Sequence, residues 1–521
     1  MRITFLGHVG LSVETRHGSV LCDPWFTPAY FGSWFPFPRN DGLDHDAFVH
    51  PDYLYLSHLH RDHFDPTFLA RVDKRSRVLL PDFEVPYLER ELRALGFTSF
   101  VRTRHGEPLD VDGLRVTIFA MNQPADGPLG DSALVLDDGD TCILNQNDAR
   151  PGDVAALQAL GPYDGHFVQF SGAIWYPITY DFLPAEQHRL ARAKRANQMH
   201  RARQYVEWIG AAHVFPCAGP PCFLDDDLWH LNDFDRDDAN IFPDQTVFLD
   251  HLEEHGIDRG RLVVPGSVVD LHHEHCAITG ADTSEPFADK HASLTRYSDD
   301  WRSWLQHERD SWARGDVDVD ELIDTLRAWF EPLLTAAPVT SAGIAGNVVF
   351  AFTEREGDDD RENGGPQGIV IDFVDSAVRA WKGDDAVYRV DVDRRLVHAC
   401  VERRLEDWVN SLFLSCRFRA HRDGPFNEYV MTFFKALSPE RIAYVERCYA
   451  AQRGGDEFFE RDGWRIERWC PHRQADLTRF GEIADGVLTC ALHHWQFDLA
   501  TGRCLTSDDR RLRCEPVERP V

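Results

Sequence analysis

The decisive stretch of this sequence is Tyr53-Leu54-Tyr55-Leu56-Ser57-His58-Leu59-His60-Arg61-Asp62-His63, which joins an apolar run to a loop rich in metal-binding side chains. The apolar run, 53–56, predicts a short buried β-strand. The loop follows it directly and offers three imidazoles and one carboxylate. Side chains placed so close together can converge on one metal ion or on two.

The pattern H-x-H-x-D-H immediately after an apolar strand is typical of the metallo-β-lactamase fold, and the neighbouring sequence agrees. Strands are predicted at 3–6, 11–14 and 20–22, and a hairpin is predicted to turn at Asp138-Gly139. A long amphipathic helix is predicted over 185–209. Strands that feed loops, with helices outside them, predict an α/β domain built as an αββα sandwich.

The predicted ligands of this domain differ from those of hydrolases with the same fold. The later positions at which such hydrolases carry histidine correspond to 123–127 and 214–219, and neither segment contains one. Asp148 follows a strand-like run and supplies a carboxylate. His58, His60 and Asp148 thus form a two-histidine, one-carboxylate set, which is typical of non-haem iron with open positions for O2. We predict these three as the catalytic residues.

Other polar residues near this set have less definite roles. Asp62 and His63 are predicted either to hold a second metal ion or to support the ligands of the first. His8, in a Gly-His turn, is expected to have a structural role or to support the ligands rather than to be a ligand itself. Asp126 and Asp131 match no ligand motif, and the sequence assigns them no role.

A second metal-binding pattern lies near the C-terminal end, as Cys470-Pro471-His472 and Cys490-Ala491-Leu492-His493. C-x-H followed by C-x-x-H at this separation is the ligand set of a Rieske [2Fe–2S] cluster, in which two thiolates hold one iron and two imidazoles the other. Cys470, His472, Cys490 and His493 are therefore the predicted cluster ligands. Such a cluster transfers single electrons and performs no bond chemistry by itself, so the function depends on the centre it supplies.

The composition excludes several classes of partner. The chain has 521 residues, of which 43% are hydrophobic and 27% are charged, as in ordinary soluble proteins. Its formal charge of −31 argues against nucleic acid or an anionic membrane surface, because both would repel it. No apolar run approaches the roughly 18 residues of a membrane span, and the first residues predict a strand rather than a signal peptide. We expect a cytoplasmic protein with mostly reduced cysteines.

Three regions are predicted along the chain: 1–280 as the catalytic metallo-β-lactamase-like domain, 281–450 as a helical or α+β middle region, and 451–521 as an all-β Rieske domain. Helices are predicted at 301–312 and 320–334 of the middle region. This region contains no catalytic motif. It is expected to be a structural spacer or a second small domain, and closure over a substrate is the alternative.

Four segments resemble one enzyme family, that of CMP-N-acetylneuraminate hydroxylase and its bacterial relatives. They are Cys22–Pro28, Leu56–His63, Phe215–Gly219 and His493–Asp498. The resemblance covers most of the first domain and the Rieske region. In the animal sialic-acid enzyme the Rieske domain comes first, whereas here it comes last. The layout is more similar to the actinobacterial branch that acts on UDP-N-acetylmuramate.

This resemblance implies a monooxygenase that inserts oxygen into the N-acetyl methyl group of a sugar nucleotide, first of all UDP-N-acetylmuramate, to give UDP-N-glycolylmuramate for peptidoglycan. It also implies one or two non-haem irons, O2, and electrons from NAD(P)H through a separate reductase or ferredoxin. The expected partners are thus the sugar nucleotide and the electron-transfer protein, and the sequence leaves homo-oligomerisation open. CMP-N-acetylneuraminate, another sugar nucleotide or a natural-product intermediate are the alternative substrates.

Two hypotheses from other classes remain open at this point. The first is a zinc hydrolase of the metallo-β-lactamase fold that carries a Rieske appendage. The second is an electron carrier whose front domain has lost its catalytic role. Bound metal and dependence on O2 distinguish the hydrolase from the oxygenase, and the effect of replacing His58 on product formation tests the electron carrier.

Overall fold

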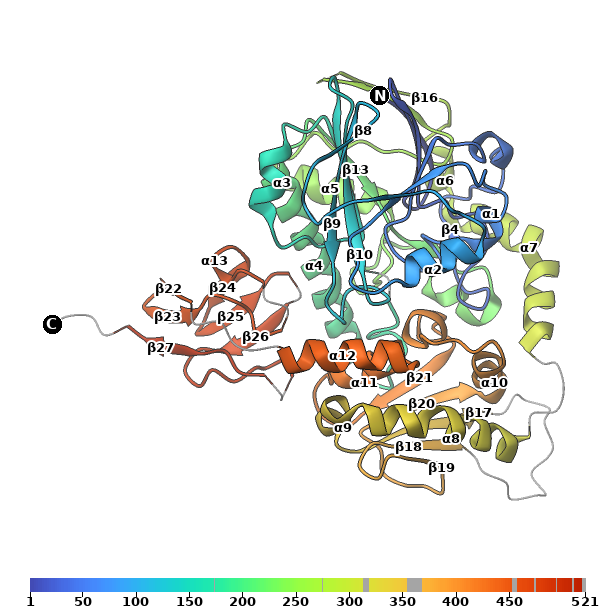
Figure 1. Ribbon diagram of the computed structural model, residues 1–521, viewed down its shortest axis with the longest axis vertical. Coiled ribbons are helices and arrows are strands. Elements are labelled where there is room, and N and C mark those ends of the chain that lie inside the picture. Colours follow the sequence, from blue (N-terminus) through green and yellow to red (C-terminus); the bar gives the residue numbers. More distant parts are fainter. Residues whose placement is uncertain are drawn as a thin grey trace.

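The computed structural model of the chain describes residues 1–172, 174–273, 275–312, 318–353, 368–451, 457–472, 475–492, 494–507 and 510–517. Figure 1 shows a large two-sheet domain at the top, a smaller sheet-and-helix domain below it, and a small β domain at the side. In the described part of the chain, no helix combines the length and apolar character that crossing a membrane requires.

The first sheet of the large domain has eight strands and begins with the predicted meander. Its order is β16-β15-β1-β2-β3-β5-β6-β7, antiparallel from β16 to β3 and parallel from β3 to β7. The bounds are β1 Arg2–Gly7, β2 Gly10–Thr15, β3 Gly18–Cys22, β5 Tyr53–Tyr55, β6 Arg77–Leu80, β7 Phe100–Arg102, β15 Val268–His272 and β16 His275–Thr279.

The second sheet has six strands in the order β13-β12-β11-β10-β9-β8. The predicted hairpin at Asp138-Gly139 is confirmed, because β10 and β11 pair antiparallel across it. The bounds are β8 Leu109–Val111, β9 Leu114–Met121, β10 Asp131–Asp137, β11 Cys142–Asn147, β12 Gly165–Gln169 and β13 His213–Cys217.

The two sheets face each other, and helices cover their outer faces. Along β5, Tyr53 and Tyr55 lie in the core shared by the two sheets, while Leu54 and Leu56 lie in the core under the helices of the first sheet. This alternation is the two-residue period of a strand buried on both faces. The helices on the first sheet are α1 Pro66–Leu69 and α2 Tyr87–Ala94, and those on the second are α3 Val154–Leu160, α4 Pro184–Ile209 and α5 Gln245–Glu254.

The large domain is thus the predicted αββα sandwich of the metallo-β-lactamase type. The long helix predicted over 185–209 is confirmed as α4. It ends at Gly210, whose positive φ of 65° is the left-handed conformation that glycine adopts readily at a helix end. A further helix, α7 (Lys290–Trp312), packs Tyr297, Trp301 and Trp304 around Phe35 of this domain.

The second unit is an α+β domain around a five-stranded sheet of order β19-β18-β17-β20-β21. Its strands are β17 Asn347–Thr353, β18 Gly368–Asp372, β19 Ala377–Ala380, β20 Tyr388–Asp393 and β21 Phe418–Arg422. Its helices are α8 Val319–Ala336, α9 Pro338–Ile344, α10 Arg394–Glu402, α11 Glu428–Lys435 and α12 Pro439–Ala451, with a π-helical turn, η3, at Val409–Phe413.

This second unit is more than a spacer, because it shares one hydrophobic core with the large domain. Trp25, Tyr30 and Trp175 of the large domain belong to the same cluster as Trp408 and Phe413 of the second unit. Trp175 and Phe413 meet edge to face, with ring centroids 5.5 Å apart. A continuous core of large aromatic side chains holds the two units together as one body.

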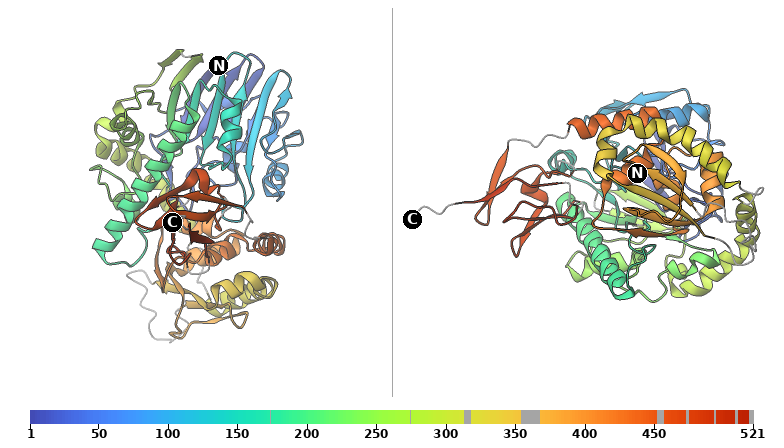
Figure 2. Two further views of the ribbon diagram at one scale, coloured as in Figure 1. Left: turned by 90° about the vertical axis from the view of Figure 1, so that its left-hand side faces the viewer. Right: turned by 90° about the horizontal axis from the view of Figure 1, so that it is seen from below.

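The third unit is a β domain that projects to one side of the other two (Figures 1 and 2). It contains two three-stranded sheets of order β22-β23-β27 and β24-β25-β26 and a short helix, α13. The bounds are β22 Phe458–Arg461, β23 Trp464–Glu467, α13 Leu477–Phe480, β24 Gly481–Ala484, β25 Val487–Cys490, β26 Trp495–Asp498 and β27 Cys514–Pro516.

Candidate metal centre and Rieske site

The metal-binding loop begins where β5 ends, and Asp23 fixes its first residue. Asp23 follows β3, the parallel neighbour of β5, so the ends of both strands meet at one edge of the sheet. Its carboxylate accepts hydrogen bonds from the Ser57 amide at 2.7 Å and from the Ser57 hydroxyl at 2.6 Å. Asp23 is completely buried, so these bonds hold the start of the loop rigidly against β3.

The structure brings together the three residues predicted to be catalytic. His58 and His60 come from the loop after β5, and Asp148 follows the end of β11 in the opposite sheet. Each offers one ligand atom, and these atoms lie within 4.8 Å of one another. The two facing sheets therefore each supply part of one set of metal ligands.

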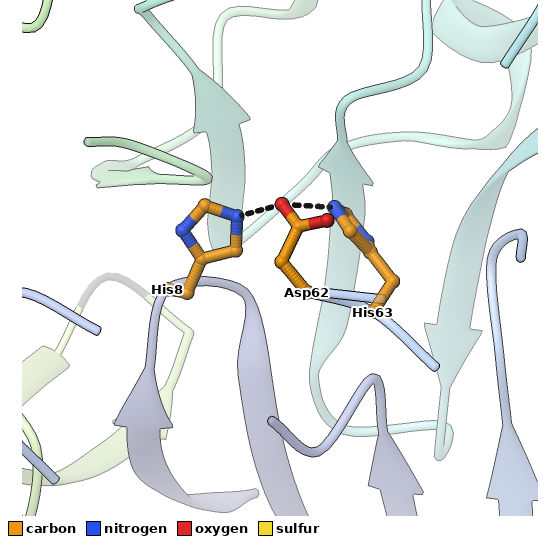
Figure 3. A group of neighbouring side chains, drawn as sticks. All are labelled: His8, Asp62 and His63. Carbon is orange, nitrogen blue, oxygen red and sulfur yellow. Dashed lines mark ion pairs between the residues drawn. The ribbon is translucent and has the colours of Figure 1, made fainter. Parts of the chain in front are cut away.

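A second group, which lies beside the first, contains His8, Asp62 and His63 (Figure 3). His8 comes from the turn between β1 and β2, and its Nε2 lies 2.9 Å from Asp62 Oδ2. His63 Nε2 lies 3.8 Å from the same oxygen and 3.6 Å from Asp148 Oδ1. His63 thus connects the two groups, and the structure adds His8 to the residues that the sequence placed here.

Hydrogen bonds fix which nitrogen of each imidazole faces the site. His63 Nδ1 lies 3.1 Å from Asp23 Oδ2 and His58 Nδ1 lies 3.2 Å from Asp131 Oδ1, so both protons sit on Nδ1 and the Nε2 lone pairs point inward. A carboxylate that receives the outer N–H of a ligating histidine is the usual support of a metal site. The structure gives that role to Asp131, for which the sequence had none.

His60 differs from these two histidines, because its Nδ1 faces the site. Its outer nitrogen, Nε2, contacts Asn410, which lies on η3 in the second unit. The Asn410 amide nitrogen donates to Asp407 Oδ2 at 2.8 Å, so its oxygen faces His60 Nε2, also at 2.8 Å. His60 Nε2 is therefore the donor, and Nδ1 carries the lone pair. That atom lies 2.7 Å from His58 Nε2. Two lone pairs facing each other at this distance require a shared cation or proton.

Buried atoms without hydrogen-bond partners support the same conclusion. His63 Nε2 and Asp148 Oδ1, which face each other across the site, are buried and have no hydrogen-bond partner. Buried polar atoms are nearly always satisfied, so two that face each other indicate a ligand that is neither a side chain nor the backbone. Imidazole nitrogens and carboxylate oxygens suit zinc and iron alike. The residues present therefore fit one or two transition-metal ions.

The electrostatics of the side chains agree with metal binding. Burial, together with the neighbouring His58, lowers the pKa of His60 to about 3, so its lone pair is available. Burial raises the pKa of Asp148, but His63 more than offsets this, and the pKa falls to about 2. Burial lowers the pKa of His63, yet Asp148 and Asp62 bring it well above its ordinary value. An ionised Asp148 and a neutral His60 are the states that a metal requires of its ligands, and a metal that binds His63 Nε2 would displace the proton that the two carboxylates favour there.

Replacing Asp23 by asparagine is expected to lower the affinity of this centre for its metal by about 10- to 100-fold, because asparagine keeps only one of the two acceptor oxygens that Ser57 and His63 use. Metal content after dialysis against a graded chelator series measures the effect. Asp65→Asn is the matched control. Asp65 is equally buried and accepts three backbone N–H bonds, from Phe26, Thr27 and Phe68, but contacts none of the ligands. Equal metal loss in both variants would mean that Asp23 acts only through folding.

The residues predicted as Rieske ligands lie in two loops of the third unit. Cys470 and His472 lie between β23 and α13, and Cys490 ends β25. All three are buried, and the ring of His472 stacks on Trp495 with centroids 3.9 Å apart. His493, the fourth predicted ligand, lies outside the described residues. Its neighbour His494 has Nε2 3.0 Å from the Asn197 carbonyl on α4, so His494 joins the domain to that helix.

The third unit packs against two helices of the large domain, α3 and α4. Val154 of α3 and Tyr205 of α4 belong to its hydrophobic core. The Tyr205 hydroxyl donates to the Pro151 carbonyl at 2.9 Å, three residues along the chain from Asp148. A covalent and hydrogen-bonded path therefore runs from a residue in the core of the third unit to a residue of the front centre.

The comparisons with known proteins agree with this geometry. Residues 462–514 match the Rieske [2Fe-2S] domain family, and residues 322–451 match the family described as "Rv3818-like, SCP2-like domain". The crystal structure of CmlA, a diiron beta-hydroxylase from Streptomyces venezuelae, is 18% identical with a TM-score of 0.35, covering 54% of each chain. The strand order of the two facing sheets defines the fold of the front domain.

The fold and the two sites define a Rieske [2Fe–2S] protein with a metallo-β-lactamase-like domain. Relatives that match the chain over almost its whole length identify the family to which it belongs. The chain is 44% identical over 528 residues to a Rieske 2Fe-2S iron-sulfur protein of Mycolicibacterium smegmatis, with 99% of this chain and all of the relative covered. It is also 44% identical to Rv3818 of Mycobacterium tuberculosis, over 98% of this chain and 99% of that one. The chain belongs to this family of Rieske iron-sulfur proteins.

Proposed function

We propose that this chain is a Rieske-dependent non-haem iron monooxygenase that hydroxylates the N-acetyl methyl group of a sugar nucleotide, with UDP-N-acetylmuramate as the substrate. One observation carries the proposal: a one-electron cluster domain and a domain with a histidine–carboxylate metal centre occur in one chain and pack against each other. A hydrolase needs a metal but no electron source. Activation of O2 needs both.

The proposed roles follow from the contacts. His58, His60 and Asp148 would hold one iron, and His8, Asp62 and His63 would hold a second. The two ligand sets are adjacent, because Asp148 Oδ1 of the first lies 3.6 Å from His63 Nε2 of the second. Bound iron would supply the capacity to bind and reduce O2, which no amino-acid side chain has. Asp23, Asp131 and Asn410 hold the outer nitrogens of three histidines and so keep the inner lone pairs directed at the metals.

The substrate is proposed from the sequence resemblance, which favours UDP-N-acetylmuramate because the Rieske domain comes last. The proposal includes NAD(P)H as the source of electrons, delivered through a separate reductase. CMP-N-acetylneuraminate has the same N-acetyl group on a different sugar and nucleotide, so it is the informative competitor. Discrimination between them would come from contacts with the sugar and nucleotide rather than with the methyl group.

One assay tests the proposal directly. The purified protein is incubated with a reductase, NADPH and O2, and with UDP-N-acetylmuramate whose N-acetyl methyl group is fully deuterated. The expected product has gained one oxygen from labelled O2 and lost one deuterium, as read by mass spectrometry. Oxygen gained with full retention of deuterium would place the reaction elsewhere on the molecule. Conversion without O2, in protein that contains zinc, would instead support a hydrolase.

A further inference from the structure

The Rieske ligand His472 contacts the second unit through a buried carboxylate. Its Nε2 lies 2.7 Å from Glu428 Oε2, and the two side chains are 6% and 7% exposed. Because Nε2 faces Glu428, the nitrogen left for the cluster iron is Nδ1. The imidazole is thus held on its face by Trp495 and at its outer nitrogen by Glu428. A glutamate buried to this extent is uncommon unless it has charged or hydrogen-bonding partners.

The second unit keeps Glu428 in place. Asn427 caps the N-terminus of α11 by accepting from the Tyr429 amide at 3.0 Å, and Glu428 is the first residue of that helix. The Tyr449 hydroxyl, on α12, lies 3.2 Å from Glu428 Oε1, and Arg510 of the Rieske domain lies 3.6 Å from the same oxygen. The carboxylate is therefore fixed by the second unit and meets a cation of the third.

The same helix reaches the front domain at its other end. Lys435, the last residue of α11, donates to the carbonyl oxygens of Ala125 and Gly127 at 3.1 and 2.9 Å. These residues lie in the loop that leads to Asp131, the partner of His58. The turn η3, which packs against α11, carries Asn410, the partner of His60. The second unit thus contacts a ligand of each metal site.

We propose that the second unit supports both metal sites, with Glu428 as the positioning residue that orients His472 and sets the reduction potential of the cluster. A carboxylate at the outer nitrogen of a ligating histidine raises the basicity of the imidazole and adds negative charge beside the iron. Both effects favour the oxidised cluster, since reduction adds a further negative charge. Glu428 therefore lowers the potential, which increases the driving force for passing an electron onward.

Glu428→Gln keeps the shape of the side chain and removes its charge. It is expected to raise the midpoint potential, with about a tenfold change in the ratio of reduced to oxidised cluster at a fixed applied potential, or about 59 mV for one electron. A redox titration followed by the EPR signal of the reduced cluster measures this without turnover. Glu482→Gln is the matched control, because Glu482 joins the Rieske domain to His200 and Gln204 but contacts none of the described predicted ligands. Its potential should not move.

A second variant decides the matter if Glu428→Gln does not assemble the cluster. Tyr449→Phe removes a hydrogen-bond donor from Glu428, leaves the carboxylate more basic, and should shift the potential downward by a smaller amount. An unchanged potential in Glu428→Gln that keeps its EPR signal would overturn the proposal, as would an unchanged potential in Tyr449→Phe. The inference rests on the Rieske cluster of the proposed function but not on its substrate. Failure of the sugar-nucleotide assay would leave these potentials unaffected.

Discussion

Replacing His493 by alanine is expected to abolish both the EPR signal of the reduced Rieske cluster and product formation, whereas replacing His494 by asparagine should leave the signal intact. The spacing Cys470-x-His472 and Cys490-x-x-His493 places His493, not its neighbour, in the ligand position. His494 lies 3.0 Å from the carbonyl of Asn197 and has a φ of 58°, a conformation that asparagine tolerates. We therefore expect its side chain to hold the Rieske domain against α4 rather than to bind the cluster.

The two variants form a matched pair of adjacent histidines. EPR of the dithionite-reduced proteins, with iron and sulfide content, measures cluster assembly independently of catalysis. Circular dichroism checks that the folds are intact. A retained signal in His493→Ala, together with a lost signal in His494→Asn, would move the ligand assignment to His494. If His493→Ala lost turnover but kept the EPR signal, His493 would be needed for catalysis without being a ligand of the cluster.

The fold of the front domain could be predicted because local patterns carry it. The apolar run Tyr53–Leu56, the turn at Asp138-Gly139 and the long run of helix-forming residues that becomes α4 each specify one element. The loop with His58, His60, Asp62 and His63 is contiguous, so its side chains are brought together by a single turn of chain. Asp148 could be placed as well, because carboxylates often follow the ends of strands in this fold.

The rest of the site depends on contacts that no local pattern records. His8 lies in a short turn 50 residues before His58, and the sequence favoured a structural or ligand-supporting role for it. Asn410 and Glu428 lie in the second unit, hundreds of residues from the front-domain ligands in sequence. That unit has no catalytic motif, and its helices show only an ordinary apolar face. Its contacts with His60 and His472 become visible only when three separate units are packed together.

The second large effect is expected at the front centre, where His60→Ala should reduce product formation by at least about 10³-fold, or roughly 4 kcal/mol of transition-state stabilisation. The lone pair of His60 Nδ1 lies 2.7 Å from that of His58, so its loss removes one of three ligands that converge from two sheets. The Rieske signal should be unchanged, because His60 belongs to a different unit. The loss should therefore be catalytic rather than a failure of electron supply to the protein.

His105→Ala is the control for this variant, because His105 belongs to the same domain and has Nδ1 2.7 Å from the Ala120 carbonyl, outside both ligand groups. Its turnover should stay near that of the unmodified protein. Metal analysis of active protein is expected to find iron beyond the two atoms of the [2Fe–2S] cluster, and less of it in His60→Ala. Zinc in stoichiometric amount with only the cluster irons would contradict the oxygenase and favour the hydrolase. Unchanged product formation in His60→Ala would instead mean that the front domain takes no part in the chemistry, leaving the Rieske domain as an electron carrier.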